Sequence, residues 1–365
     1  MKAWYEVENE TAVDSPALLI YPDRVQENIR IMMSFIDDPV RLRPHIKTNK
    51  SPQAVQMLHQ AGIRKVKCAT IPELRLAAEA GMTDILLAYQ PTGPKVARLI
   101  EVLRSFPDIT FGCLADNHRS AASLGAALTQ AGLSIRVWID LNVGMNRTGV
   151  EPGSEATDLF LCCLGIPGLE PVGLHAYDGH LRDSDLRIRT QRCDDAFQRV
   201  RETANQIRAA CGKEPVICAG GTPTFPIHAR RPDIECSPGT FIYWDTGYGD
   251  LLKEQPYLHA ALVMTRVISK PAKDMLCLDL GHKSIAAENP LANRVTFLNG
   301  TGLEPVGQSE EHLVVRTSDA DNYRVGQVLY GVPFHVCPTV ALYDHAWSVR
   351  DGRAVADWHQ TAREK

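Results

Sequence analysis

Short apolar runs alternate with amphipathic stretches over the first two thirds of the chain. Between the runs, apolar positions recur at helical spacing, and the longest such stretch, 183–210, starts at good N-cap residues and stops before Gly212. The apolar runs lie at residues 17–21, 42–47, 65–69, 84–89, 110–114, 135–141, 171–177 and 216–219. Near-continuous apolar strands that alternate with helices are typical of a parallel sheet covered on both faces. Eight strands in this rhythm predict a (β/α)8 barrel rather than an open doubly wound sheet.

The pattern changes after about Leu258. The later apolar runs have the composition of strands, are separated by turns, and have no helical stretch of comparable length between them. This texture predicts a mostly antiparallel β-domain. The fold class is therefore α/β, with a TIM-like (β/α)8 barrel over residues 14–255. The smaller β-domain is expected over residues 256–365, joined by residues 1–13.

Composition narrows the class of protein. The chain has 365 residues, 44% of them hydrophobic, and a net charge of -4, which argues against a nucleic-acid partner. No apolar run reaches the roughly 18 residues that a membrane span needs, and the first six residues lack the apolar core of a signal peptide. The ten cysteines have neither framework spacing nor a C-x-x-C pair, as expected for reduced thiols. We therefore expect a cytoplasmic protein.

Candidate catalytic side chains follow the predicted strands. In a barrel of this kind such groups lie at the carboxyl ends of the strands. Lys47 ends the second run, Arg147 follows the sixth, and Tyr177 ends the seventh. Arg43, His45 and Lys47 alternate along one predicted strand, so they should project from one face. An anion among these three groups would relieve their repulsion, although a solvated basic edge is the commoner explanation for such a pattern.

Glycines and threonines follow the eighth run. Gly220, Gly221 and Thr222 come directly after it, and Gly239 and Thr240 lie a little further on. Free backbone N–H groups and hydroxyls at such a corner suit a phosphate, although each segment alone is more often a simple turn. Together with a lysine, an arginine and an aromatic ring, they fit pyridoxal phosphate. This cofactor needs a lysine for a Schiff base, donors for its phosphate, and a group against its ring.

His335 and Cys337 form a candidate metal pair. Two residues apart in a strand, they would share one face, and imidazole with thiolate favours zinc. Two protein ligands leave positions for water or substrate, which is a catalytic rather than a structural arrangement. For an isolated pair at this spacing, packing is the more frequent role.

Taken together, these segments resemble the fold-type III pyridoxal phosphate enzymes, which share the alanine racemase barrel. Within that class the chain looks like the D-threonine aldolase and D-serine dehydratase group. The matching segments occur in the family's order, at residues 14–18, 43–48, 142–149, 220–224, 309–312 and 333–339.

The resemblance implies roles for these residues. Lys47 would hold the cofactor as a Schiff base, Arg147 would approach its phenolate oxygen, and Tyr177 would flank its ring. The phosphate would be bound by Gly220, Gly221, Thr222, Gly239 and Thr240. His335 and Cys337 would bind a divalent metal, with zinc preferred over manganese. The family usually forms dimers in which each β-domain closes the partner's barrel, which implies a homodimer.

The resemblance also implies a lyase acting on small D-β-hydroxy amino acids. We favour D-threonine aldolase, which yields glycine and an aldehyde, and residues 86–91 look nearer to the aldolases. The alternative is a zinc-dependent dehydratase of D-serine or D-3-hydroxyaspartate, because Cys337 stands where the aldolases usually have aspartate. Asn49 also departs from the family, which more often has histidine there.

Two other functions are disfavoured. An amino-acid racemase has no use for a metal pair, and a non-catalytic pyridoxal phosphate-binding protein would lack the second domain. The roles of His175, His180 and His312 stay open, because strand register decides whether these side chains project into the barrel or away from it.

Overall fold

The structure, a computed structural model, describes residues 3–364. Met1, Lys2 and Lys365, which fall within the expected domain ranges, lie outside the described residues. The chain divides into two compact units. One contains the N-terminal residues through Ile31 together with Thr48–Ala54 and Thr240–Arg363, and the other contains Met32–Lys47 and Val55–Gly239.

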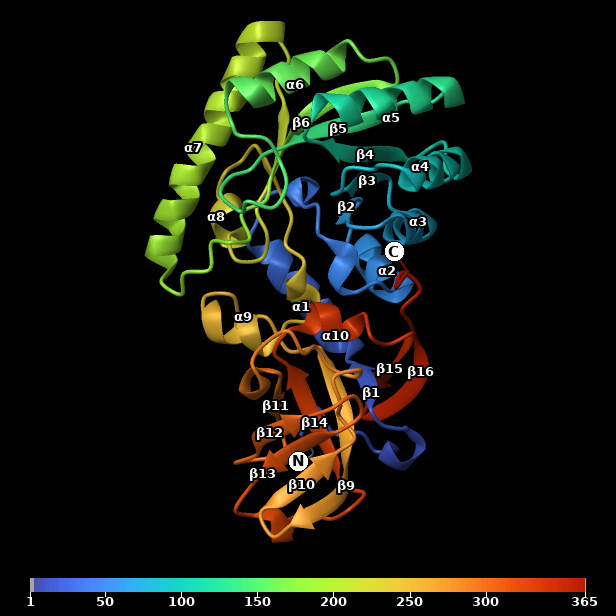
Figure 1. The fold of residues 1–365 in the computed structure, drawn as a ribbon, viewed down its shortest axis with the longest axis vertical. Helices are drawn as coiled ribbons and strands as arrows, with labels where there is room; N and C mark the ends of the chain where they lie inside the picture. The colour runs from blue at the N-terminus through green and yellow to red at the C-terminus, as the bar shows by residue number, and fades with distance from the viewer. Residues whose placement is uncertain (1–2, 365) are drawn as a thin grey trace. The chain divides into compact units, whose positions relative to one another are not determined.

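A seven-stranded parallel sheet forms the second unit. Its order, β2-β3-β4-β5-β6-β7-β8, follows the chain, so each strand pairs with its sequence neighbours (Figure 1). This arrangement, with helices between successive strands, confirms the predicted fold class. The strands are β2 (Lys65–Cys68), β3 (Asp84–Leu87), β4 (Thr110–Ala115), β5 (Ile135–Asp140), β6 (Leu169–Ala176), β7 (Val216–Ala219) and β8 (Ile234–Cys236). The main helices are α3 (Ile71–Glu79), α4 (Pro94–Ser105), α5 (His118–Ala131), α6 (Ser154–Leu164), α7 (Leu186–Cys211) and α8 (Phe225–His228).

The longest helix, α7, has local signals at both ends. Asp185 caps it by accepting a hydrogen bond from the Arg187 backbone N–H, and Gly212 ends it at a φ of 73°, a left-handed conformation that glycine adopts readily. The observed N-cap, Asp185, therefore lies one or two residues after the predicted N-cap residues 183 and 184. In the part of the chain that the structure describes, no helix is both long and apolar enough to cross a membrane.

An irregular segment, rather than a strand, occupies the eighth position of the barrel. Leu42 makes a parallel bridge to Cys236 of β8, and His45 makes one to Lys67 of β2, so the segment closes the sheet between these edges. Pro44 interrupts it, because proline has no N–H to donate to a ladder. The expectation of a regular strand over 42–47 is therefore wrong, although the segment lies where that strand was expected. The actual last strand, β8, was missed because only three residues form it.

The apolar run near residue 17 belongs to the other sheet. This strand, β1 (Ala17–Ile20), pairs antiparallel with β9 (Ala261–Ala272) and parallel with β15 (His345–Arg350). Its assignment as the first barrel strand is therefore wrong. All four residues are buried, and a strand buried on both faces has the same apolar signature in either sheet.

The nine-stranded sheet of the first unit is mostly antiparallel, as predicted for the C-terminal region. Its main path is β12-β13-β10-β9-β1-β15-β16, with β11 and β14 paired beside it. Val7, from the N-terminal segment, packs in the core of this sheet with Leu262 and Tyr330. The remaining strands are β10 (Met275–Leu278), β11 (Val295–Phe297), β12 (Glu304–Gln308), β13 (Leu313–Arg316), β14 (Val328–Pro333) and β16 (Arg353–His359).

An ion-pair network lies toward the amino ends of the barrel strands. Arg43 is 1% exposed, and its guanidinium bonds Glu235 at 2.7 Å and Asp84 at 2.6 Å. Lys65 reaches Glu235 at 2.6 Å. The expectation that Arg43 joins His45 and Lys47 in one basic cluster is therefore wrong, because its charge is already balanced by these buried carboxylates.

Replacing Arg43 with methionine should destabilise the protein strongly. The change leaves Glu235 and Asp84 without their main cation, which in a buried pair costs about 3–5 kcal/mol of unfolding free energy. Arg192→Met is the matched control, because Arg192 pairs with Asp183 from a half-exposed position and should cost less than about 1 kcal/mol. Urea-induced unfolding checks both values. Equal effects of the two substitutions would contradict the structural importance of the Arg43 network.

Candidate active site

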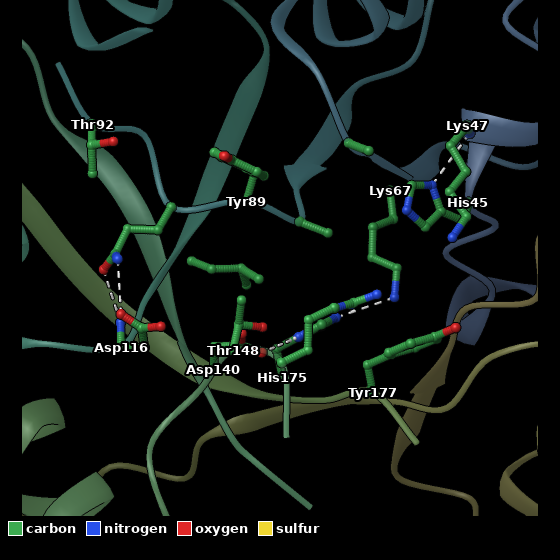
Figure 2. A pocket seen from close by; sticks show the side chains of 15 residues that line it. His45, Lys47, Lys67, Tyr89, Thr92, Asp116, Asp140, Thr148, His175 and Tyr177 are labelled. Carbon is green, nitrogen blue, oxygen red and sulfur yellow. Dashed lines mark hydrogen bonds and ion pairs between the residues drawn. The ribbon is translucent and has the colours of Figure 1, made fainter. Parts of the chain in front are cut away.

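A cavity of about 550 Å³ opens at the carboxyl ends of the barrel strands (Figure 2). This volume is within the roughly 300–1,000 Å³ typical of small-molecule sites. The lining residues come from the ends of β2 to β6 and from the closing segment. They include His45, Lys47, Lys67, Tyr89, Gln90, Asp116, Asp140, Arg147, Thr148, His175 and Tyr177. Three of the residues singled out from the sequence, Lys47, Arg147 and Tyr177, therefore line one cavity.

Lys47 lies in a single turn of 3-10 helix, η3 (Ile46–Thr48), and not at the end of a strand. Its backbone N–H donates to Nδ1 of His45 at 3.3 Å, which ties the turn to the neighbouring imidazole. Its side chain is half-buried, and its amine lies 5.9 Å from the centre of the Tyr177 ring. The turn therefore presents the amine to the cavity without burying it completely.

Two glycines make room for the ring of Tyr177. A Cβ on Gly179 would lie 2.1 Å from the Tyr177 hydroxyl, and one on Gly221 would lie 2.9 Å from the ring. The guanidinium of Arg147 lies 5.0 Å from the ring centre, within cation–π range. Tyr177 and Arg147 are thus held together at one wall of the cavity.

A hydrogen-bonded chain that the sequence did not predict crosses the cavity floor. His175 Nδ1 lies 2.7 Å from Asp140 Oδ1, and His175 Nε2 lies 3.2 Å from the amine of Lys67 (Figure 2). All three side chains are buried. His175 lies two residues before Tyr177, near the carboxyl end of β6, and both line the cavity. The alternation of side chains in the strand expected over 171–177 would have placed the two on one face. Lys67 was visible only as a cation within an apolar run.

Burial and neighbouring charges set the protonation of this chain. Burial would raise the pKa of Asp140, but the hydrogen bonds from His175 and Thr148 and the nearby Lys67 act against burial, and that pKa is lowered. Burial lowers the pKa of His175, and the nearby Lys67 adds to the effect. Burial also lowers the pKa of Lys67. An ionised Asp140 that accepts from the Nδ1–H of a neutral His175 leaves Nε2 to accept from Lys67.

The two glycine loops after β7 and β8 lie against each other. The backbone N–H of Gly239 donates to the Thr222 hydroxyl at 3.1 Å. The N–H of Gly221 donates to the Thr224 hydroxyl at 3.4 Å, and that of Gly220 donates to the Ala176 carbonyl at 2.9 Å. The expectation that the three glycine N–H groups are free is therefore wrong, because the loops bond internally.

Thr240 lies in the first unit, in the 3-10 turn η4 (Thr240–Ile242). Its buried hydroxyl lies 3.8 Å from the sulfur of Cys337. The sulfur also lies 3.1 Å from the hydroxyl of Thr48, which directly follows Lys47 in the chain. Cys337 therefore has polar contacts with two hydroxyl groups.

His335 and Cys337 lie at the start of a helix, so their expected placement in a strand is wrong. β14 ends at Pro333, and His335 is the N-cap of α10 (Val336–Val340). The two side chains nevertheless interact, since Cys337 raises the pKa of His335. Glu288 bonds Nδ1 of His335 at 2.5 Å. Burial would lower the pKa of His335, but the contacts with Cys337 and Glu288 outweigh it and raise the pKa to about 9.

The other two histidines that the sequence left open have different surroundings. His312 is exposed, and its ring lies 3.5 Å from the Ser309 hydroxyl in the same turn, which fits a surface-turn residue. His180 packs on Gly144, where a Cβ would lie 2.8 Å from its ring. Among the described residues, Nδ1 of His180 has no hydrogen-bond partner.

Comparison with known proteins places the chain among relatives of alanine racemase. Residues 20–246 match the family described as alanine racemase, N-terminal domain, and residues 260–349 match the putative serine dehydratase domain. The chain is 30% identical over 357 residues to a D-threonine aldolase of Arthrobacter sp, covering 96% of this chain and 93% of the relative. It is 26% identical over 382 residues to a D-threo-3-hydroxyaspartate dehydratase of Delftia sp. (strain HT23), covering 95% and 97%.

The crystal structure of a D-threonine aldolase from Filomicrobium marinum has a similar fold. It matches with a TM-score of 0.89 at 26% identity, and the match covers 100% of this chain and 99% of the other. The resemblance seen in the sequence motifs is therefore confirmed over both sheets.

The neutral state of His175 should make stability depend on pH. The pKa of His175 is lowered below its ordinary 6.5, so the stability that it contributes is present above that value and is lost as pH falls through its folded-state pKa. The free energy of unfolding should therefore fall more steeply between about pH 7 and pH 5 in the native protein than in His175→Gln, by at most about 1.4 kcal/mol per pH unit. Urea unfolding at several pH values measures the two slopes. Parallel slopes would show that His175 titrates normally.

Proposed function

Because the chain belongs to the alanine racemase N-terminal domain family, we propose that it is a pyridoxal phosphate-dependent D-threonine aldolase, a lyase that yields glycine and an aldehyde. The observation that carries the proposal is the single cavity in which Lys47, Arg147 and Tyr177 meet at the carboxyl ends of the strands. The relatives are named for reactions of D-β-hydroxy amino acids, which supports the substrate class. Dehydration of the same kind of substrate is the second candidate, because Cys337 would supply a thiolate ligand where the aldolases usually have aspartate.

The cavity fits the cofactor. Lys47 is our candidate for its attachment, since the other amine that lines the cavity, Lys67, is buried and bonded to His175. Tyr177 would flank the ring, and Arg147 would face its phenolate oxygen. Bound in this way, pyridoxal phosphate supplies an electron sink that weakens bonds at the α-carbon of an amino acid.

The glycine loops fit a phosphate, even though their N–H groups have internal partners. Both Gly221 and Gly239 donate to hydroxyl oxygens, and the Gly221 contact is long for a hydrogen bond. A phosphate oxygen carries charge and would bond strongly to an N–H that it shares with a hydroxyl oxygen, and the long Gly221 contact suits such sharing. We therefore keep Gly220, Gly221, Thr222, Gly239 and Thr240 as the proposed phosphate residues.

The chain Asp140–His175–Lys67 would control a proton at the cavity floor. Asp140 holds the His175 ring in one tautomer, and the ring then holds the Lys67 amine in place. With one hydrogen directed to His175, the remaining positions on the Lys67 nitrogen are available to the cavity. Lys67 can thus hold or release a proton there while Lys47 is occupied by the cofactor.

His335 and Cys337 are our proposed ligands for a divalent metal, with zinc preferred. Glu288 bonds Nδ1 of His335, an arrangement that leaves Nε2 to a metal and fixes the ring. Asp245 accepts from the Val336 N–H at 3.0 Å and holds the backbone between the two ligands. The metal would act as a Lewis acid on the β-oxygen of the substrate.

The cavity wall favours threonine over 3-hydroxyaspartate. Ala88, Tyr89 and Leu114 line it with apolar surface, beside the carboxylate of Asp116. Asp116 is held by Gln90 at 2.8 Å and by the Gly149 N–H at 3.2 Å. An anionic Asp116 would repel a second substrate carboxylate, whereas a methyl group fits an apolar wall.

Homodimer formation stays a prediction from the family resemblance.

Product analysis tests the proposed reaction. Purified protein with pyridoxal phosphate and zinc should convert D-threonine to glycine and acetaldehyde, as measured by amino-acid chromatography and aldehyde trapping. Formation of 2-oxobutyrate and ammonia without glycine would instead support the dehydratase.

Lys47→Ala is the negative variant for this assay. It should lose the visible absorbance of the lysine-bound cofactor and at least about 100-fold of the rate. Lys95→Ala is the matched control, because Lys95 lies over Tyr89 and does not line the cavity. Retention of that absorbance by Lys47→Ala would contradict the assignment of the attachment site.

The ligand type at position 337 should set the preferred metal. Chelation with EDTA should abolish turnover, and zinc should restore it. In Cys337→Asp, manganese should restore turnover better than zinc, since carboxylates suit manganese and thiolates suit zinc. Cys162→Ser, at an exposed thiol, serves as the control and should keep the native metal preference. An unchanged preference in Cys337→Asp, or full activity after chelation, would contradict the metal assignment.

A further inference from the structure

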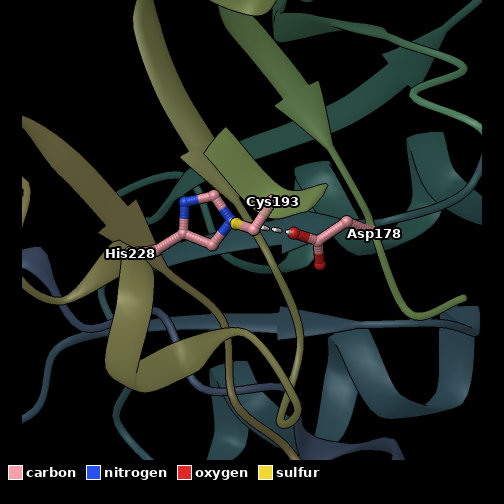
Figure 3. A group of neighbouring side chains, drawn as sticks. All are labelled: Asp178, Cys193 and His228. Atoms are coloured by element: carbon pink, nitrogen blue, oxygen red, sulfur yellow. Dashed lines mark hydrogen bonds and ion pairs between the residues drawn. The ribbon is translucent and has the colours of Figure 1, made fainter. Parts of the chain in front are cut away.

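Figure 3 shows a buried polar cluster of Asp178, Cys193 and His228. It lies next to Gly220, in the loop that follows β7. Asp178 follows β6, Cys193 lies in α7, and His228 ends α8. His228 Nε2 lies 2.8 Å from Asp178 Oδ2 and 3.4 Å from the sulfur of Cys193. Each of the three residues is at most 4% exposed. Oxygen, sulfur and nitrogen atoms at these separations form a set of donors that could hold a metal.

Arg231 argues against a metal in this cluster. Its guanidinium donates to Nδ1 of His228, and arginine stays protonated in proteins. Nδ1 must therefore be the acceptor, so in the neutral ring the proton lies on Nε2 and is donated to Asp178. A metal would need the lone pair of that nitrogen. Burial, assisted by the charge of Asp178, also raises the pKa of the Cys193 thiol to about 12, so the sulfur is not a thiolate.

The same hydrogen bonds continue into the glycine loop. The Thr224 hydroxyl donates to Asp178 Oδ1 at 2.7 Å, and the Gly221 N–H donates to the Thr224 oxygen at 3.4 Å. Thr224 is completely buried. Burial would raise the pKa of Asp178, but the hydrogen bonds from His228 and Thr224 act against burial, and that pKa is lowered. An ionised Asp178 can only accept, so the Thr224 proton points to it and the Thr224 lone pairs point to the loop.

The loop backbone lies directly on this network. A Cβ on Gly220 would lie 2.6 Å from the His228 ring and 3.0 Å from the Thr224 hydroxyl, and Gly220 has a φ of +79°. Gly220 therefore has no space to move toward the cluster. The position of His228 limits where the backbone of residues 220 and 221 can lie.

We propose that Arg231, His228, Asp178 and Thr224 form a buried positioning relay that orients the Gly220–Gly221 backbone to bind the phosphate monoester of the cofactor. The relay deepens the proposed function and rests on it. The donor order runs from Arg231 to His228 to Asp178, and from Gly221 through Thr224 to the same carboxylate. None of these four side chains needs to contact the cofactor for the relay to act.

Asp178→Asn tests the relay with little change of shape. The amide can accept from Thr224, but its NH2 group then faces the Nε2–H of His228, donor against donor. The dissociation constant for pyridoxal phosphate, measured on the apoprotein by tryptophan fluorescence, should rise about 10-fold or more. The constant for pyridoxal, which lacks the phosphate, should stay within about two-fold, because nothing else in the cavity changes. Asp194→Asn is the matched control, since Asp194 pairs with the outer side of Arg231 from a half-exposed position.

Thr224 provides a second pair of variants in case Asp178→Asn fails to fold. Thr224→Val removes the hydroxyl at constant shape and should weaken pyridoxal phosphate selectively. Thr224→Ser keeps the hydroxyl and should restore native binding. Equal weakening of both ligands in the valine variant would mean general loosening and would overturn the relay, as would native binding of both. If the native protein bound neither ligand, the proposed cofactor itself would be wrong.

Metal analysis provides a further check on the cluster. The relay requires that no bound zinc depend on Cys193. One zinc per chain that persists in His335→Ala and disappears in Cys193→Ser would make the cluster a metal site and would overturn the relay.

Discussion

The backbone pairing of one irregular segment with two strand edges is the constraint on which the barrel site depends. Leu42 pairs with Cys236 and His45 with Lys67, so the segment fills the gap between the last strand and the first strand of the parallel sheet. Without it the sheet would keep two open edges, which expose unpaired backbone groups. Because the segment is fixed at both edges, the turn that carries Lys47 has a defined place at the mouth.

The closed barrel also separates two sets of charges, one at each end of its strands. Arg43 lies toward the amino ends of the strands, where Glu235 and Asp84 balance it. At the carboxyl ends, the three cations Lys47, Lys67 and Arg147 line the cavity with two carboxylates, Asp116 and Asp140. The cationic excess is therefore confined to the mouth, where an anionic cofactor and an amino-acid carboxylate would reduce it. The apolar layer between the two ends, which includes Leu86, Leu114 and Trp138, keeps these charge sets apart.

Buried carboxylates hold the groups of the barrel site in place through hydrogen bonds in two separate chains. Asp140 holds His175, which holds Lys67, and Asp178 holds Thr224, which contacts Gly221. In both cases an ionised, buried carboxylate determines where a proton lies on a neighbouring group. Burying an ionised carboxylate is costly unless its oxygens accept hydrogen bonds. Each carboxylate therefore restricts the positions that its hydrogen-bond partners can take. The cavity side chains and the glycine loop therefore have little freedom to rearrange.

The sequence by itself determined the alternation of strands and helices, the change to an antiparallel sheet, and the motifs of Lys47, Arg147, Tyr177 and the glycine loops. These features depend on local periodicity and on short segments, which a linear chain displays directly. Only the tertiary structure decided that β1 joins the antiparallel sheet, because an apolar run does not specify its partner. It also decided that His335 and Cys337 start a helix, since two residues of spacing are compatible with several backbones. The chains through Lys67 and His228 required the structure for a physical reason. Their key hydrogen bonds, such as Lys67–His175 and His228–Asp178, join residues that are 35 to 108 positions apart and leave no local pattern in the sequence.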